Sequence, residues 1–460
     1  MTDIGELESE ERERLRRVVS LSTELTDITE VEYRQVRLER VVLIGVWDTG
    51  TLTDAEASMA ELARLAETAG CSVVDAVIQR RESPDAATYI GSGKVQEIRH
   101  LVSVTNADTI ICDGELSPAQ LRRLETETKV KVVDRTWLIL DIFARHAKSR
   151  EGKNQVSLAQ MEYMLPRLRG WGEALSRQAG GRAGGASGGV GTRGPGETKL
   201  ETDRRRIRQQ ISKLRKDLRD LAKVRQTQRQ HRMQSGVSQV ALVGYTNAGK
   251  SSLLNLLTGA GVLVQDELFA TLDPTVRKLN LPSGREVTMA DTVGFVRHLP
   301  HQLIEAFKST LEEVTHASTL LHVVDASSDR IEDHIDAVRE VLMEIKAPLE
   351  NEVIVFNKID SVSREVVTRL EQNYPDCVMV SALSGVGKEQ LLEKIDSHVP
   401  GQEFEIWALL PYGEEKLLEK LRRHSNILSL RYEESGTLIH VKTDLQFAQA
   451  LHSFRIEGEG

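Results

Sequence analysis

Eight residues in the middle of the chain have the types and spacing of a phosphate-binding loop. The sequence Gly-Tyr-Thr-Asn-Ala-Gly-Lys-Ser at 244–251 fits GxxxxGK[ST], between an apolar run, Val240–Val243, and a helical pattern, Ser251–Leu257. Its glycines let backbone N–H groups curl around a β-phosphate, Lys250 brings a positive charge to the β- and γ-phosphate oxygens, and the Ser251 hydroxyl can ligate Mg²⁺. The expected phosphate-binding residues are Gly244, Tyr245, Thr246, Asn247, Ala248, Gly249, Lys250 and Ser251.

Two later stretches have residues that could sense a γ-phosphate. Asp291-Thr-Val-Gly294 follows a strand-like run, where an aspartate can hold the Mg²⁺ hydration shell and the Gly294 N–H can approach the γ-phosphate. Before it, Phe269–Asp273 offers Thr271 as a second hydroxyl for the metal. Either match alone means little, but their order after the phosphate loop makes both informative. The expected residues are Phe269, Ala270, Thr271, Leu272, Asp273, Asp291, Thr292, Val293 and Gly294, with Ser251 and Thr271 as metal ligands.

Two further strand ends have residues suited to a guanine base. Asn357-Lys-Ile-Asp360 closes the run Glu352–Phe356, and a carboxylate at Asp360 could accept the N1–H and 2-amino protons of guanine, a donor pair that adenine lacks. Ser381-Ala-Leu383 would place a backbone N–H on the guanine O6. Five elements in this order predict a GTPase domain. The expected base-side residues are Asn357, Lys358, Ile359, Asp360, Ser381, Ala382 and Leu383.

The residue after Gly294 is unusual for such a domain. Many GTPases have a glutamine there that orients the attacking water, whereas this chain has Phe295, which cannot hydrogen-bond water. We therefore expect slow intrinsic hydrolysis, with the water oriented by a partner or by another part of the chain. The catalytic residue is left unassigned.

One segment is strongly basic inside an acidic protein. Residues 164–232 contain 18 Lys and Arg against 6 Asp and Glu, a local charge of +12, which leaves −21 for the rest of a chain whose total is −9. A localised cationic element can neutralise phosphates that an acidic surface would repel. The segment is therefore a candidate RNA contact, with an inert glycine-rich linker as the alternative. The candidate contacts are Arg177, Arg182, Arg193, Lys199, Arg204, Arg205 and Arg206.

The elements around this segment predict an antiparallel helical hairpin. Apolar residues recur at spacings of three and four over Leu158–Leu168 and Ile207–Leu221, which is the seam of a coiled coil. Between them, 180–196 has nine glycines in seventeen residues. Thr198 with Glu201 resembles a capping box that would open the second helix.

The 460 residues predict an α/β multi-domain protein, since one core rarely holds so long a chain. We expect a monomer. We also expect a cytoplasmic protein, because no apolar run approaches the ~20 residues that span a bilayer. The three cysteines indicate neither a disulfide framework nor a zinc site. The expected parts are an acidic N-terminal arm (1–35), an N-terminal parallel α/β domain (36–148), an antiparallel helical hairpin (149–237), a P-loop GTPase domain (238–400) and a small C-terminal α+β module (401–460).

The chain resembles the HflX family of ribosome-associated P-loop GTPases, within the Obg-HflX-like superfamily. The resemblance rests on the motifs above together with Phe269–Thr275, Gly194-Pro-Gly-Glu-Thr-Lys-Leu-Glu201 and Gly91-Ser-Gly-Lys94. It implies GTP and GDP binding, Mg²⁺ at Ser251 and Thr271, and binding to the large ribosomal subunit and its rRNA, with the hairpin loop directed toward the peptidyl-transferase region. It also implies separation of stalled or stress-inactivated ribosomes into subunits.

Two other functions are also compatible with the sequence. The protein could be a GTPase for ribosome assembly or regulation, or an RNA-binding scaffold whose GTP site only sets domain orientation. We expect no integral membrane association and leave a peripheral one open. The stretch Gly91-Ser-Gly-Lys94 imitates a phosphate loop, but Thr88 and Val95 stand where the motif needs Gly and Ser or Thr, so a helix-opening turn is expected there.

Overall fold

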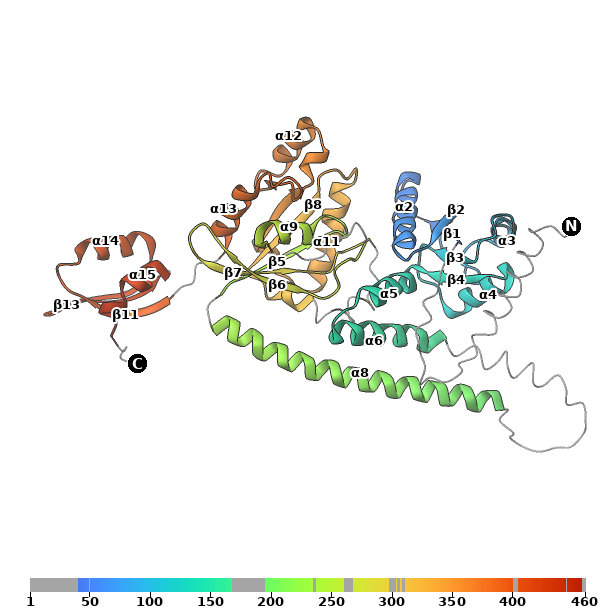
Figure 1. Cartoon of the computed structure of the whole chain (residues 1–460), viewed down its shortest axis with the longest axis horizontal. Helices are drawn as coiled ribbons and strands as arrows, with labels where there is room; N and C mark the ends of the chain where they lie inside the picture. The colour runs from blue at the N-terminus through green and yellow to red at the C-terminus, as the bar shows by residue number, and fades with distance from the viewer. Residues whose placement is uncertain are drawn as a thin grey trace, which may run out of the picture.

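The computed structural model describes residues 40–48, 50–167, 195–234, 237–259, 268–297, 303, 307, 311–399, 404–443 and 445–456. The predicted arm at 1–35 lies outside these residues, and so do most of the glycine-rich stretch and the candidates Arg177, Arg182 and Arg193. The described part is an α/β multi-domain protein, as predicted (Figure 1). None of its helices is long and apolar enough to cross a membrane.

The N-terminal part contains a four-stranded parallel sheet in the order β2-β1-β3-β4. The alternation of apolar strands with amphipathic helices produces it, because each helix returns the chain to the same end of the sheet. Gly91 is the N-cap of α3, which confirms the helix-opening turn. The elements are β1 (Arg40–Trp47), α2 (Leu52–Thr68), β2 (Ser72–Arg80), α3 (Ser92–Thr105), β3 (Thr109–Cys112), α4 (Pro118–Thr128), β4 (Lys131–Asp134) and α5 (Arg135–His146).

Two helices, α6 (Arg150–Arg167) and the 40-residue α8 (Pro195–Gln234), lie side by side (Figure 1). They are antiparallel, since Glu151 at the start of α6 pairs with Arg225 far along α8, and Glu162 pairs with Arg215. The predicted seam is present in a cluster of Leu158, Ile207 and Ile211 with Met161, Leu165, Leu214 and Leu218.

The start of α8 differs from the prediction. The helix begins at Pro195, so Thr198 lies inside its first turn and is not the N-cap. Proline suits this place because the first helical N–H has no partner within the helix, and the ring fixes φ near the helical value. The predicted capping box at Thr198 and Glu201 is therefore wrong.

The GTPase part has a six-stranded sheet in the order β10-β9-β8-β5-β7-β6, parallel except for the edge strand β6. Because carboxyl ends of parallel strands meet at one edge, the predicted motifs gather there. The elements are β5 (Gln239–Gly244), α9 (Lys250–Thr258), β6 (Thr275–Asn280), β7 (Glu286–Asp291), β8 (Thr319–Asp325), α11 (Ile331–Glu344), η3 (Leu349–Asn351), β9 (Glu352–Asn357), η4 (Ile359–Ser361), α12 (Arg364–Asn373), β10 (Val378–Met379) and α13 (Lys388–His398).

The C-terminal part is a three-stranded antiparallel sheet, β11-β13-β12, with its own apolar core, at one end of the molecule in Figure 1. It matches the predicted α+β module. Its elements are β11 (Phe404–Leu410), α14 (Glu415–His424), β12 (Asn426–Glu433), β13 (Gly436–Thr443), α15 (Leu445–Ala450) and η5 (His452–Phe454).

The largest apolar core is shared between the N-terminal and GTPase parts. It contains Leu43 of β1 together with Phe295 from the GTPase motifs. Phe143 of α5 belongs to this core, and its ring centroid lies 4.6 Å from those of both Phe269 and Phe307. The two parts therefore pack as neighbours through residues that belong to the predicted nucleotide site.

Candidate functional site

The phosphate loop has the backbone shape that its glycines permit. Gly244 and Gly249 have φ of +150° and +90°, and a Cβ at either would collide with Val323 or Asn357. Lys250 is 6% exposed and donates hydrogen bonds to the carbonyl oxygens of Gly244 (3.1 Å) and Tyr245 (2.9 Å). Burial lowers the pKa of Lys250 to about 8, against the raising effect of Asp291. A cation is thus held at the point where phosphate oxygens would bind.

The three predicted metal-site residues meet in space. The Ser251 hydroxyl lies 2.5 Å from Asp291 Oδ2 and 2.9 Å from Thr271 Oγ1, and Thr271 Oγ1 lies 3.2 Å from the same carboxylate oxygen. Asp291 is fully buried, and its other oxygen, Oδ1, has no hydrogen-bond partner within the described residues. Burial raises the pKa of Asp291. Hard oxygen groups with one carboxylate oxygen to spare fit Mg²⁺, which binds few protein ligands and keeps several waters.

The base side is organised by Asn357. Its amide donates to the carbonyl of Ala248 (2.9 Å) and accepts from the N–H of Ala382 (2.9 Å), so it joins the phosphate loop to the Ser381–Leu383 turn. Asp360 is exposed, and a 2.5 Å hydrogen bond from the Ser381 hydroxyl lowers its pKa. The carboxylate is therefore ionised and accessible, as an acceptor for guanine N–H groups requires.

The segment Leu268–Thr275, here called the Thr271 loop, has side chains that point in two directions. Thr271 points to the metal-site residues, whereas Phe269 (2% exposed, φ +59°) and Leu272 are buried in the shared core. The Asp273 carboxylate accepts hydrogen bonds from the N–H groups of Lys148 (3.0 Å) and Ser149 (2.7 Å) and from the Ser149 hydroxyl (2.5 Å). Of the five residues predicted here, only Thr271 has a side chain placed to reach metal or phosphate.

Ser149 is the link between this loop and the hairpin. Its hydroxyl accepts from the N–H of Gly152 (2.8 Å), so it caps the N-terminus of α6 while donating to Asp273. A side chain at Gly152 would collide with Asp273. The Thr271 loop is therefore anchored on the first turn of α6.

A second set of contacts joins the N-terminal part to the phosphate loop. The Tyr245 hydroxyl donates to Glu61 (2.8 Å) and accepts from the N–H of Arg297 (2.8 Å). Arg135, 3% exposed, pairs with Glu61 (3.1 Å) and Asp113 (2.7 Å) and donates to the carbonyl of Arg297 (3.1 Å). Sequence reasoning missed Glu61 and Arg135, because single charged residues in a separate domain give no local signal of this contact.

Phe295 is fixed with its side chain in the shared core. It is 1% exposed, its N–H donates to the carbonyl of Gly244 (3.1 Å), and its carbonyl accepts from Thr246 (2.7 Å). Val293 also lies in that core, and the Thr292 hydroxyl donates to the carbonyl of Leu242 (2.6 Å). None of these three side chains is available to a water at the phosphate.

The other predicted residues take varied positions. Lys358 pairs with Asp325 (2.8 Å), which also accepts hydrogen bonds from the N–H and hydroxyl of Ser327. Ile359 packs in a small apolar cluster, and Leu383 is 89% exposed. Among the RNA candidates, Arg205 and Arg206 are exposed on α8, Arg204 is half-buried, and Lys199 lies in the first turns of the same helix.

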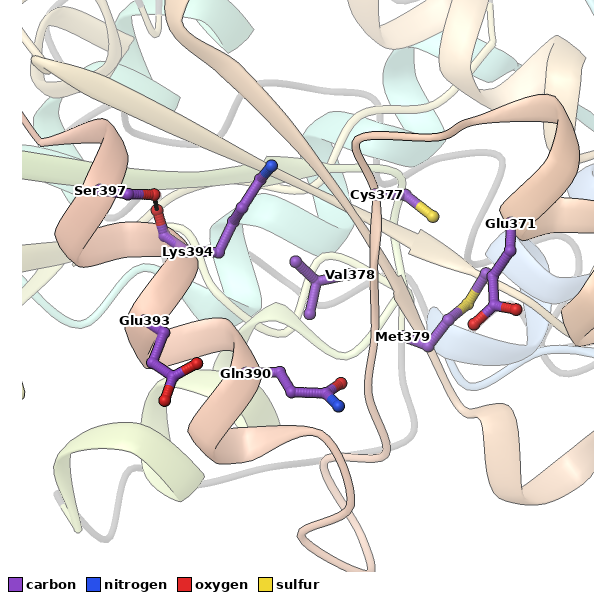
Figure 2. Close-up of a pocket in the computed structure, with 8 residues that line it drawn as sticks. All are labelled: Glu371, Cys377, Val378, Met379, Gln390, Glu393, Lys394 and Ser397. Carbon is purple, nitrogen blue, oxygen red and sulfur yellow. Dashed lines mark hydrogen bonds between the residues drawn. The ribbon is translucent and has the colours of Figure 1, made fainter.

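A separate open pocket of about 380 Å³ lies between α12, β10 and α13 (Figure 2). None of the motif residues lines it, and burial raises the pKa of Cys377, so its thiol is not a reactive thiolate. The pocket is therefore no part of the nucleotide site. Its lining residues are Glu371, Cys377, Val378, Met379, Gln390, Glu393, Lys394 and Ser397.

Known proteins are similar to this chain along most of its length. Three family models match consecutive parts of the chain: GTP-binding GTPase N-terminal (residues 56–144), GTP-binding GTPase Middle Region (146–232) and 50S ribosome-binding GTPase (239–358). A GTP-binding protein from the archaeon Sulfolobus solfataricus, solved with GDP, aligns with 25% identity over 78% of this chain and 98% of that one, at a TM-score of 0.40.

Curated relatives match nearly the whole chain. GTPase HflX of Lacrimispora saccharolytica is 44% identical over 91% of this chain and 95% of that protein. GTPase HflX of Escherichia coli is 41% identical over 87% of this chain and 92% of that protein. Because these relatives are 41–44% identical over most of the chain, the chain belongs to the HflX family and is a GTPase.

Proposed function

We propose that this protein is a Mg²⁺-dependent GTPase that binds the large ribosomal subunit and splits stalled or stress-inactivated ribosomes into subunits in the cytoplasm. The basic hairpin would contact rRNA, and the ribosome would stimulate hydrolysis. The description of the family that matches residues 239–358, 50S ribosome-binding GTPase, supports the partner. We expect a monomer that binds GTP and GDP in turn.

The observation that carries the proposal is a continuous set of contacts from the metal site to the basic hairpin. Thr271 contacts Ser251 and Asp291, and Asp273, two residues later, holds the Ser149 cap of α6. In turn, α6 packs along α8. A γ-phosphate and Mg²⁺ that order Thr271 would therefore also bias the helix that bears the exposed arginines.

Mg²⁺ would supply positive charge to the β- and γ-phosphate oxygens during hydrolysis. Ser251 and Thr271 would hold it directly, and Asp291 would hold its waters. Lys250 would neutralise phosphate charge, and Asp360 would select guanine. Loss of the γ-phosphate would release Thr271 and, through Asp273, weaken the hold on α6, which favours departure from the ribosome.

The first experiment measures binding to large subunits by co-sedimentation with GMPPNP or GDP over a salt series. We expect tighter binding with GMPPNP and a linear fall of log affinity with log salt, at a slope of about −0.7 to −0.9 per phosphate contact. The double variant Arg205→Ala/Arg206→Ala should lose two phosphate contacts, which makes the slope less negative by about 1.5. The matched control is Arg364→Ala/Arg369→Ala, which removes two exposed arginines from α12.

The outcomes separate the functions. Equal binding with both nucleotides, or the same salt slope for both double variants, would contradict the proposal. Binding only to immature subunits would favour the ribosome-assembly function. Deletion of 180–196 should abolish ribosome splitting, measured by light scattering, while the affinity for GDP stays unchanged.

A further inference from the structure

The Thr246 hydroxyl is a buried polar group with no partner at the phosphate end of the site. Thr246 is 7% exposed, and its Oγ1 has no hydrogen-bond partner within the described residues. The other orphan there is Asp291 Oδ1, which a hydrated Mg²⁺ would satisfy. A buried hydroxyl without a partner lowers the stability of the folded state by about 1–3 kcal/mol, so a group bound in the site is expected to satisfy this one.

The neighbours of Thr246 are the groups that would surround a γ-phosphate. A Cβ built on Gly294 would lie 2.8 Å from Thr246 Cγ2 and 3.0 Å from Lys250 Nζ. The Thr246 side chain, Gly294 and Lys250 therefore border one small volume, which the Thr246 methyl group faces, and rotation about the Cα–Cβ bond of Thr246 brings its hydroxyl there instead. The Gly294 N–H and the Lys250 ammonium are the γ-phosphate contacts expected of these motifs.

Other side chains around this volume are already engaged. The hydroxyls of Ser251 and Thr271 lie in the metal site, and that of Thr292 donates to a backbone carbonyl. The Tyr245 hydroxyl is bonded to Glu61 and Arg297, and Phe295 is fixed in the shared core. Thr246 thus has the one unengaged hydroxyl among these described residues.

The geometry points to Thr246 as the residue that orients the attacking water, the task that Phe295 cannot perform. Its hydroxyl can accept a hydrogen bond from the water and donate one to a γ-phosphate oxygen. The water oxygen then bonds to the γ-phosphorus, while the bond to the β–γ bridging oxygen breaks and leaves its electron pair on GDP. The water proton passes to a γ-phosphate oxygen, and Thr246 is unchanged.

The test is single-turnover GTP hydrolysis by the full chain without ribosomes, with GDP affinity measured in parallel. Thr246→Val keeps the shape and removes the hydroxyl, and we expect about 100-fold slower hydrolysis. GDP affinity should stay within about two-fold, because GDP has no γ-phosphate. Thr246→Ser keeps the hydroxyl and should stay within about five-fold of the wild-type rate, since hydroxyl chemistry is preserved. The matched control is Thr368→Val on α12, where the hydroxyl contacts only its own helix.

A second readout separates catalysis from packing. Binding of GDP with AlF₄⁻, which mimics the transferring phosphoryl group, should weaken in Thr246→Val by about the same factor as the rate. If the valine variant does not fold, we expect Thr246→Ala to show the same loss of hydrolysis rate and of GDP–AlF₄⁻ binding. Hydrolysis by Thr246→Val within three-fold of wild type would overturn the inference. So would a parallel loss of GDP affinity that serine does not rescue.

Discussion

The two halves of the nucleotide site are built differently. The guanine half uses only the GTPase part: Asn357 and Asp360 are tied to the phosphate loop and to Ser381. The phosphate half is shared, because Tyr245 bonds to Glu61 of α2 and Asp273 bonds to Ser149 at the start of α6. The proposed base recognition would therefore be local, whereas the residues expected around the γ-phosphate are held by two other parts of the molecule.

The largest expected effect comes from the buried arginine in the shared half. Arg135→Met leaves Glu61 and Asp113 buried without their cation, and should lower the free energy of unfolding by about 3–5 kcal/mol, measured by urea denaturation. Arg123→Met is the control, because the Arg123–Glu127 pair is an exposed i,i+4 pair worth about 0.3–0.5 kcal/mol. Equal effects of the two substitutions would remove the distinction between the halves.

A substitution in the guanine half should change the affinity for the nucleotide and leave the contacts between the domains intact. Asp360→Asn replaces an acceptor of two guanine protons by an amide, and should weaken GTP binding by about 100- to 1000-fold. Xanthosine triphosphate, which presents a carbonyl in place of the 2-amino group, should bind the variant better than GTP. Fluorescence titration checks both nucleotides, and an unchanged GTP affinity would contradict the assignment of Asp360.

A smaller effect is expected at the N-terminal cap of α6, which belongs to the phosphate half of the site. Ser149→Ala removes the cap of α6 and a partner of Asp273, which should cost about 0.5–2 kcal/mol and speed amide exchange at Gly152 and Lys153. Thr51→Ala removes the comparable cap of α2 and is the control. We expect GMPPNP to slow exchange at the α6 start in the wild type, but not in Ser149→Ala. No effect of Ser149→Ala on exchange would contradict the anchoring.

The smallest effect is expected at Ser381. Ser381→Ala removes the hydrogen bond that lowers the pKa of Asp360, so that pKa should rise. Because binding needs the carboxylate, GTP affinity falls as the pH drops through this pKa, and the fall should begin at a higher pH in the variant. At neutral pH the loss should be about three- to ten-fold, as for one hydrogen bond. A pH profile identical to wild type would contradict the role of Ser381.

Most of the fold could be predicted from the sequence, because strand and helix periodicities are local. The site motifs were equally readable, and Ser251, Thr271 and Asp291 meet as expected. The roles of Phe269 and Asp273 could not be read in this way, since their partners lie more than 100 residues away in the N-terminal part and at the start of α6. Long-range packing leaves no spacing pattern in the sequence.

The same limit explains why the sequence marked Thr246 only as one residue of a loop. Its significance depends on burial, on contact with Gly294 and on the engagement of every neighbouring hydroxyl. Each of these is a property of the folded site. The glutamine missing at position 295 was visible in the sequence, but the group that could replace it was not.

We expect the presence of the γ-phosphate to be transmitted to the first turn of α6 through Asp273. Hydrogen exchange at residues 150–153 of the full chain, compared between saturating GDP and saturating GMPPNP, tests it most directly. We predict slower exchange with GMPPNP in the wild type and no difference between nucleotides in Asp273→Asn. Identical wild-type exchange in the two nucleotides, with binding of both confirmed by titration, would contradict this coupling between the γ-phosphate and α6.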